Sequence, residues 1–151
     1  TLNAAIYLRS AGASVYESAC ELKSDFCEFR KQSKILSDLV IYRGRFAIAK
    51  DEDDGAPTDR IAAAKAAESL LSIKGVDAAF ALIRIGGETH ISARSGAAVS
   101  VQLILEKMGG GGHLDSAGAR SADPMVTVLE QLKAAIDAYI EENSAPTGTE
   151  I

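Results

Sequence analysis

The sequence predicts an α/β fold, in which a mixed β-sheet is covered by helices and preceded by a helical connector. Residues 76–85 form a nearly continuous apolar run between glycines, as in a strand that is buried on both faces. Residues 88–95 alternate polar and apolar side chains, as in a strand with one face toward the core. The segments 59–72 and 124–142 have the composition and spacing of helices. Strands and helices in this order favour a sheet with helices packed on it.

The chain before residue 39 is expected to be helical. Residues 2–11 have an apolar side and precede Gly12, which predicts a first helix that ends there. Ser14 and Glu17 fit a capping box, which predicts a second helical region from there to about residue 36. Cys20 and Cys27 would lie about 10 Å apart along this helix, too far for a disulfide, so both are expected to be reduced and partly buried.

The middle of the chain predicts two short strands and an alanine-rich helix. Residues 39–42 and 45–49 are separated by Arg43-Gly44, which indicates a tight turn between strands. The acidic residues 51–54 lack the ligand spacing of a calcium loop and are expected to form a solvated loop. Thr58 is the expected cap of the helix that follows.

The second half predicts a hairpin, a short helix, a returning strand and a long final helix. Gly86-Gly87 is a hairpin signal, and Ser100 is a natural cap for a helix over 101–108. A short strand is expected over 117–120, and Asp123-Pro124 begins the last helix. From residue 144 no periodicity remains, so the tail 144–151 is expected to be disordered.

Four consecutive glycines, residues 109–112, stand directly before His113. Each glycine costs conformational entropy, but a bare backbone can approach a ligand closely and present N–H groups to an anion. A dinucleotide fingerprint needs a preceding strand and a phosphate loop needs Gly-Lys-Ser/Thr, and neither is present. The alternative is a helix end with a flexible hinge, for which one glycine would suffice.

A candidate anion clamp lies at the end of strand 88–95. Alternation places Ile91 and Ala93 on one face and His90, Ser92 and Arg94 on the other. An arginine fork can hold two phosphate oxygens, although a solvated strand arginine is the alternative. The net charge of −5 argues against a general nucleic-acid binder but permits a small anionic ligand.

Two motifs together carry a family resemblance. Ile91-Ser92-Ala93-Arg94-Ser95 and the later Gly109-Gly110-Gly111-Gly112-His113, followed by Ala117-Gly118, resemble the C-terminal substrate-binding domain of the DHH phosphoesterase superfamily, the DHH-associated domain. That superfamily contains RecJ-type exonucleases, oligoribonucleases and cyclic-di-AMP phosphodiesterases. The similarity is greatest to the last branch, and it is carried by Tyr42 and the segments 47–49, 70–76, 91–95 and 101–104. Ser116 departs from the family pattern, which has alanine there, and Asp115 adds a negative charge nearby.

The resemblance implies a domain organisation and a function. Residues 1–38 would be the helical end and connector of a DHH catalytic domain, residues 39–143 the substrate-binding domain, and 144–151 the tail. The function implied is the substrate-binding half of a manganese-dependent phosphodiesterase that hydrolyses cyclic-di-AMP to linear pApA. The alternatives are the same module in an oligoribonuclease or RecJ-like nuclease, and a non-catalytic nucleotide sensor.

The resemblance also implies the site residues. Arg94 and Ser95 would bind a substrate phosphate, His113 would contact the phosphate near the scissile bond, and three glycines would hold an oxygen through backbone N–H groups: Gly110, Gly111 and Gly112. No catalytic residue and no bound metal are expected in this chain, because His90 and His113 are too few to build a two-metal site. Manganese would be held by the DHH catalytic domain.

The implied partners are that catalytic domain in the same chain and a cyclic dinucleotide or short oligonucleotide, rather than a long duplex. A homodimer is a further option. The implied location is the cytoplasm, as a domain of a bacterial protein that could be anchored in the membrane by other segments.

Overall fold

The computed structural model describes residues 2–14 and 25–144. The predicted capping box, through Glu17, and residues 145–151 of the predicted tail lie outside the described residues, as does Cys20. Ser144, which is predicted to belong to the tail, is instead the last residue of a helix.

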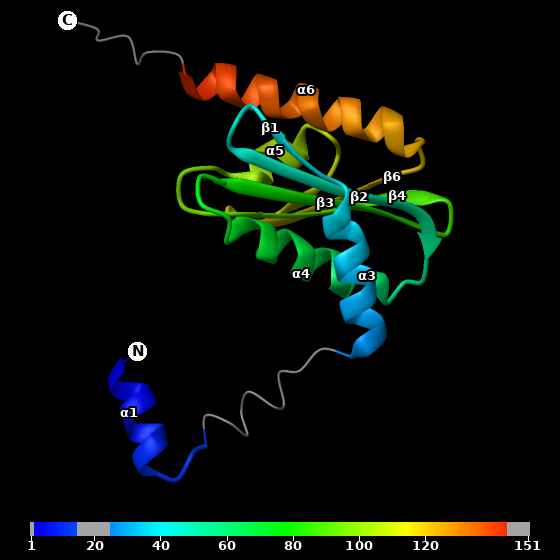
Figure 1. Ribbon diagram of the computed structural model, residues 1–151. Coiled ribbons are helices and arrows are strands. Elements are labelled where there is room, and N and C mark those ends of the chain that lie inside the picture. Colours follow the sequence, from blue (N-terminus) through cyan, green and yellow to red (C-terminus); the bar gives the residue numbers. More distant parts are fainter. Residues whose placement is uncertain (1, 15–24, 145–151) are drawn as a thin grey trace, which may run out of the picture.

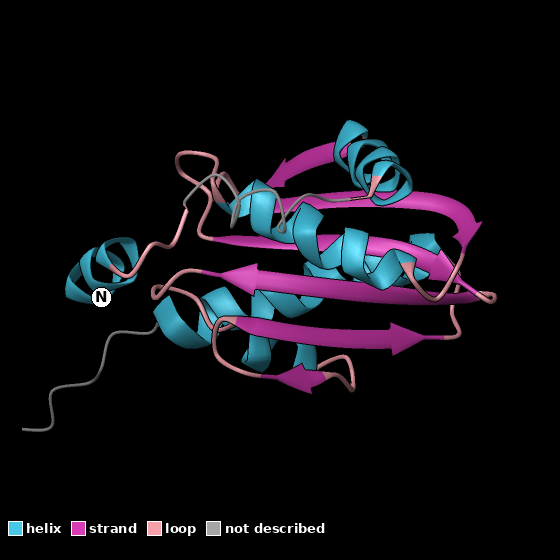
Figure 2. Ribbon diagram, turned by 90° about the horizontal axis from the view of Figure 1, so that it is seen from below, coloured by secondary structure: helices cyan, strands magenta, loops and turns pink. Residues whose placement is uncertain are grey.

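A six-stranded mixed sheet forms the centre of the molecule, in the order β1-β2-β3-β4-β6-β5 (Figure 2). The parallel pair is β2 and β3, and all other neighbours are antiparallel. The strands are β1 (Leu39–Tyr42), β2 (Phe46–Gly55), β3 (Ala78–Ile85), β4 (Glu88–Ser95), β5 (Gly111–Gly112) and β6 (Ser116–Ser121). The predicted mixed sheet is confirmed, including the hairpin at Gly86-Gly87, where both glycines have positive φ.

Helices cover both faces of this sheet (Figure 1). Helices α3 and α4 pack on one face, and α5 and α6 pack on the other. The described helices are α1 (Leu2–Ser10), α3 (Phe26–Ser37), α4 (Asp59–Leu71), α5 (Val101–Glu106) and α6 (Met125–Ser144). The helical N-terminal part is therefore confirmed for α1 and α3, while the domain boundary near residue 38 stays a prediction. Among the described residues, no helix combines the length and the apolar content needed to cross a bilayer.

The two faces of the sheet have different cores. Toward α6 the core is built from large side chains, and the predicted core face of that helix is confirmed because Val128, Leu132 and Ile136 are fully buried. Toward α4 the contact is made mostly by alanines. The sheet contributes Ala47, Ala49, Ala79 and Ala81, and the helix contributes Ala62, Ala63, Ala66 and Ala67.

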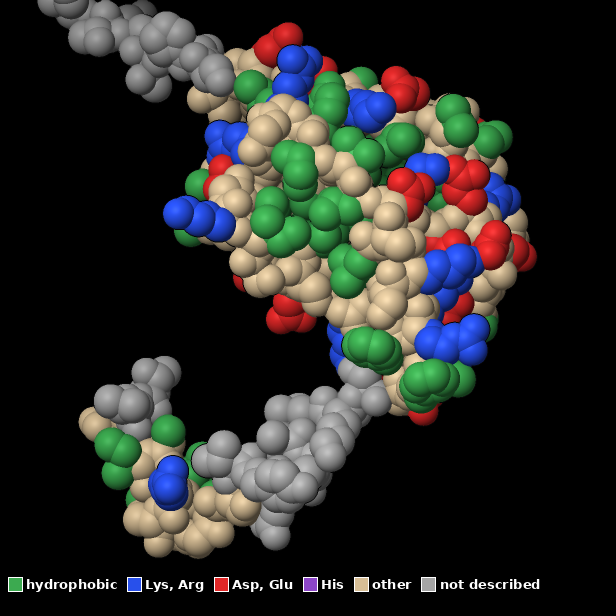
Figure 3. Space-filling view, in the orientation of Figure 1, with side chains coloured by type: hydrophobic (Ala, Val, Ile, Leu, Met, Phe, Trp, Pro, Cys, Tyr) green, Lys and Arg blue, Asp and Glu red, His purple; other side chains and the backbone are tan. Residues whose placement is uncertain are grey.

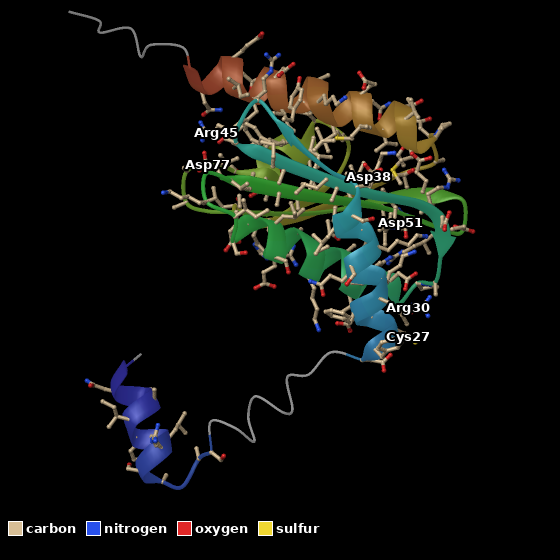
Figure 4. The ribbon with its side chains drawn as sticks, viewed as in Figure 1. Cys27, Arg30, Asp38, Arg45, Asp51 and Asp77 are labelled. Carbon is tan, nitrogen blue, oxygen red and sulfur yellow. The ribbon has the colours of Figure 1, made fainter. Side chains whose placement is uncertain are left out.

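The acidic residues 51–54 lie within β2, which differs from the sequence prediction. Strand β2 continues to Gly55 beside β3, with an irregularity between Asp51 and Asp54. Asp51 is only 5% exposed and points toward α3 (Figure 4). Lys31 Nζ lies 2.8 Å from one of its carboxylate oxygens and Lys34 Nζ lies 3.0 Å from the other. The predicted loop is wrong, because these residues belong to β2. Residues 52–54 are exposed as predicted, but Asp51 is buried, and α3 supplies two cations that neutralise its carboxylate.

Two smaller expectations also need correction. Thr58 has a helical backbone and makes no capping hydrogen bond; instead, the Asp59 carboxylate accepts the Ala56 N–H at 3.0 Å. Cys27 is a free cysteine, as expected, but its side chain is exposed.

Strand β1 is an edge of the sheet and exposes apolar side chains. Val40 is 55% exposed and Ile41 is 45% exposed, and Figure 3 shows hydrophobic side chains gathered over this edge. Exposed apolar residues on an edge strand form a possible contact surface for another chain. A homodimer stays a prediction.

The Asp51 network generates a stability prediction. We expect Asp51→Asn to lower the free energy of unfolding by about 3 kcal/mol, because two lysines lose their buried partner. Burial acts to raise the pKa of the Asp51 carboxyl, but hydrogen bonds from Lys31 and Lys34 outweigh it, and the pKa lies below its ordinary value of 3.8. The ionised carboxylate therefore stabilises the fold above about pH 4, and this contribution is lost as the pH falls further.

Urea unfolding from pH 7 to pH 3 measures both effects. The parent should lose stability below about pH 4 more steeply than Asp51→Asn does. The control is Glu68→Gln on the exposed surface of α4, which should leave the profile unchanged. Equal stability of Asp51→Asn and the parent at pH 7 would contradict the prediction.

Candidate functional site

The first glycine of the run ends a helix. Gly109 has φ +74°, and the Gly110 N–H donates to the Leu105 carbonyl at 2.9 Å, which closes the last turn of α5. A positive φ at this position is the usual way for a helix to stop. The helix-end alternative thus accounts for Gly109 and leaves three glycines to explain.

Gly110 and Gly112 are needed for close contact between β5 and β6. A Cβ on Gly110 would lie 2.4 Å from the Gly118 carbonyl oxygen, and a Cβ on Gly112 would lie 2.5 Å from the Ser116 carbonyl oxygen. Both contacts are with backbone atoms, which cannot move aside without separating the two strands. These two glycines therefore serve the fold.

Gly111 and Gly118 differ from Gly110 and Gly112, because the fold does not require a glycine at either position. They face each other across β5 and β6. A Cβ on Gly111 would meet no atom within 4 Å, and a Cβ on Gly118 would meet only the Ile91 carbonyl oxygen at an ordinary 3.4 Å. Neither has a positive φ. The result is a bare patch of backbone, which leaves room for a ligand to approach closely.

Arg94 lies on β4 directly opposite Ser116 of β6, on the face of the sheet that carries α4. It is half-buried, and one guanidinium nitrogen donates to the Ala93 carbonyl at 2.8 Å. No carboxylate of the described residues forms an ion pair with it. A guanidinium without an acidic partner is available to an external anion.

His113 lies on the other side of Ser116 from Arg94. Its backbone N–H donates to the Ser116 carbonyl at 2.7 Å, and its side chain is exposed. The loop after His113 is fixed by hydrogen bonds to its backbone carbonyl groups. The Leu114 carbonyl accepts the Val101 N–H at 3.0 Å. The Asp115 backbone carbonyl likewise accepts the Ser95 N–H, at 2.9 Å. The structure thus brings Arg94 and His113 together at one end of β4.

Two predicted interactions are not placed at this surface. Ser95 points to the opposite face from Arg94, is 6% exposed, and its hydroxyl lies 2.7 Å from the Val99 carbonyl oxygen, to which it donates. The N–H of Gly110 is already bonded to Leu105. Of the predicted site residues, the shared surface therefore comprises Arg94, Gly111, Gly112 and His113.

An open, shallow cavity of about 550 Å³ adjoins this surface, beside the start of α4 and over β4, β6 and the glycine run. Its lining includes Arg60, His90, Ser92, Gly111, Gly118 and Arg120. The alternation of β4 places His90 and Ser92 on the face of Arg94, as the sequence analysis stated. Arg60 and Arg120 were missed, because they reach the cavity through helix packing and strand register.

His90 is the buried titratable group of this cavity, with 8% exposure. Burial lowers its pKa below the ordinary 6.5, and the Arg60 and Arg120 guanidiniums add to this effect. The Glu88 carboxylate, 3.8 Å from Nε2, acts in the opposite direction. His90 is therefore neutral at pH 7 and can donate a hydrogen bond through one ring nitrogen.

The described part of the chain offers no ligand set for a metal ion. No group of three or more histidine, cysteine, aspartate or glutamate side chains within it is suitably arranged. The chemistry available at this surface is thus anion binding by guanidinium, imidazole and backbone groups.

Comparisons with known proteins show which family the chain is similar to. The model of the DHHA1 domain matches residues 44–142. The cyclic-di-AMP phosphodiesterase PdeA of Listeria monocytogenes is 42% identical over 144 residues, covering 92% of this chain and 21% of the relative. The cyclic-di-AMP phosphodiesterase GdpP of Bacillus subtilis is 40% identical over 144 residues, covering 93% of this chain and 22% of the relative. The chain spans about a fifth of the length of these curated relatives.

A solved structure shares the fold at lower identity. The crystal structure of an exopolyphosphatase-related protein from Bacteroides fragilis superposes with a TM-score of 0.75 at 20% identity, covering 91% of this chain and 42% of that one. This structure shows a shared fold, and the match of the DHHA1 model over residues 44–142 shows the family: the chain belongs to the DHHA1 domain family.

Proposed function

We propose that this chain is the substrate-binding part of a longer phosphodiesterase that hydrolyses cyclic-di-AMP to linear pApA. The observation that carries the proposal is the bare backbone of Gly111 and Gly118 beside an arginine without an acidic partner, Arg94. The support for the substrate is that relatives 40% and 42% identical are named cyclic-di-AMP phosphodiesterases.

In this proposal each group binds a phosphate in its own way. Arg94 offers a planar fork for two phosphate oxygens, and His113 donates from an exposed imidazole. Because the N–H groups of an antiparallel strand alternate in direction, and that of His113 points to β6, the Gly112 N–H points away from β6 and toward a ligand. Ser95 acts indirectly, since its hydroxyl holds the loop that follows β4.

Hydrolysis itself is assigned to another part of the longer protein. The metals implied by the family activate water for attack on phosphorus. The described residues do not fit such a role, because they hold no cluster of three metal-ligating side chains. We therefore propose that manganese is bound by a DHH catalytic domain and that the substrate lies between the two domains.

The remaining features of the proposal concern substrate size and location. A net charge of −5 disfavours a long nucleic acid as ligand, so a dinucleotide is preferred over the strand of a RecJ-like nuclease. A free cysteine, Cys27, fits a reducing compartment such as the cytoplasm. Any membrane anchor would belong to other segments of the longer protein.

Two variants test the phosphate site. Arg94→Ala and His113→Ala should each weaken binding of cyclic-di-AMP and pApA about 10- to 100-fold, because hydrogen bonds to charged groups contribute about 1.5–3 kcal/mol. Calorimetric titration of the 151-residue chain measures this. Lys133→Ala, which removes one positive charge from α6 on the opposite face, is the control and should bind as the parent does.

The same titration separates the alternatives. Tighter binding of a short RNA than of either adenine dinucleotide would favour the oligoribonuclease branch. A longer protein that binds cyclic-di-AMP but does not hydrolyse it with manganese present would favour a sensor. Manganese-dependent hydrolysis by the 151-residue chain alone would contradict the assignment of the metals to another domain.

The glycines permit a second prediction, which separates folding from binding. Gly111→Ala should leave the free energy of unfolding within about 0.5 kcal/mol of the parent, because its Cβ meets no protein atom. It should nevertheless weaken dinucleotide binding, because the methyl group occupies the ligand surface. Gly112→Ala should lower stability by about 1–3 kcal/mol through its clash with β6. Urea unfolding and calorimetry measure the two effects, and equal dinucleotide affinity of Gly111→Ala and the parent would count against the proposed surface.

A further inference from the structure

The cavity beside α4 shares the bare backbone of Gly111 and Gly118 with the phosphate site proposed above, and it extends from there along β4 to His90, away from Arg94 and His113. Arg120 lies directly opposite His90 on neighbouring strands, so both side chains belong to the same face of the sheet. Ser92 lies opposite Gly118, which leaves the space above Gly118 free of any side chain. Arg60, in the first turn of α4, completes the wall on the helix side.

The polar side chains of this cavity are hydrogen-bond donors. Arg60 and Arg120 are permanent cations that can only donate, and the Ser92 hydroxyl and the neutral His90 ring can each donate once. Neither Arg60 nor the ring of His90 has a hydrogen-bond partner within the described part of the chain. Such a set matches a ligand that is rich in acceptors and negatively charged.

One carboxylate lies at the rim. Glu88 is 4.0 Å from Arg120 Nη1 and 3.8 Å from His90 Nε2, beyond hydrogen-bond distance in both cases. It lowers the positive potential of the cavity without occupying the donors. Two guanidiniums against one carboxylate leave a net positive site.

We propose that this cavity is a second anion subsite, which binds one phosphate group of a dinucleotide while the other phosphate lies at Arg94 and His113. The proposal rests on the proposed function, since it needs the first phosphate at Arg94. Ser92 and Arg94 are next neighbours on one face of β4, and two residues of a strand span about 7 Å, a distance that one nucleotide step can cover.

The two histidines of the chain provide the test, because one lies in each subsite. Ring-proton chemical shifts of the 151-residue chain can be followed by NMR during titration with AMP, which has one phosphate, and with pApA, which has two. We expect pApA to perturb both rings and AMP to perturb only His113. A phosphate bound near His90 should also raise the pKa of that histidine by about one pH unit, with Arg60, Arg120 and Glu88 facing it unchanged.

Variants of the cavity supply an independent measurement. Arg60→Ala and Arg120→Ala should each weaken pApA binding about tenfold and leave AMP binding within about twofold of the parent. Arg60→Lys and Arg120→Lys keep the charge and should lose less affinity than the alanine variants, because only the planar fork is removed. Glu88→Gln should tighten pApA binding, and Lys133→Ala is again the control for net charge.

The outcomes distinguish this inference from the proposed function. If pApA leaves the His90 ring unchanged and the Arg60 and Arg120 variants bind as the parent does, while Arg94→Ala abolishes binding, the second subsite is wrong and the proposed function stands. If Arg94→Ala binds pApA as the parent does, both fail. Equal loss of AMP and pApA in Arg60→Ala would also overturn the second subsite, because the cavity would then bind the first phosphate.

Discussion

The site depends on how closely two short strands approach each other. β5 is only two residues long, yet its backbone lies against β6 so tightly that a methyl group on Gly110 or Gly112 would contact backbone atoms at about 2.5 Å. This contact fixes the direction of the chain between α5 and His113. Without it, the bare patch of Gly111 and Gly118 would not lie level with Ser92 of β4, the neighbour of Arg94 on the same face of that strand. One steric requirement thus organises a surface to which three strands contribute.

Much of the fold follows from local signals that do not depend on distant partners. The buried run that became β3, the alternation of β4 and the Gly86-Gly87 turn each report on their own backbone, and each was predicted correctly. Asp51 was not, because a buried carboxylate is acceptable only when cations from another element neutralise it. Lys31 and Lys34 are about twenty residues away in sequence, and no local pattern indicates that they will turn toward β2.

The residues of the candidate site also fall into two groups: those that local sequence signals predict, and those that depend on contacts between distant elements. Arg94 and His113 could be singled out because the residue types and their motifs are contiguous in the chain. The direction of Ser95 follows from strand alternation, but the partner that occupies its hydroxyl, the Val99 carbonyl, depends on the loop conformation. Arg60 and Arg120 could not be found, because one depends on how α4 packs and the other on the register between β4 and β6. Resemblance to a family identifies the motif residues but not the other residues that line the cavity beside them.

The alanines between α4 and the sheet have a consequence for ligand size. Small side chains on both sides allow the helix to lie close to the strands, and this spacing sets how far Arg60, in the first turn of α4, lies from the sheet. A larger residue at Ala63 or Ala66 would move the helix, and Arg60 with it, away from the sheet without contacting the cavity. The position of Arg60 is thus determined by buried residues that never contact the ligand, so related chains can change their ligand by repacking this layer while they keep every motif residue.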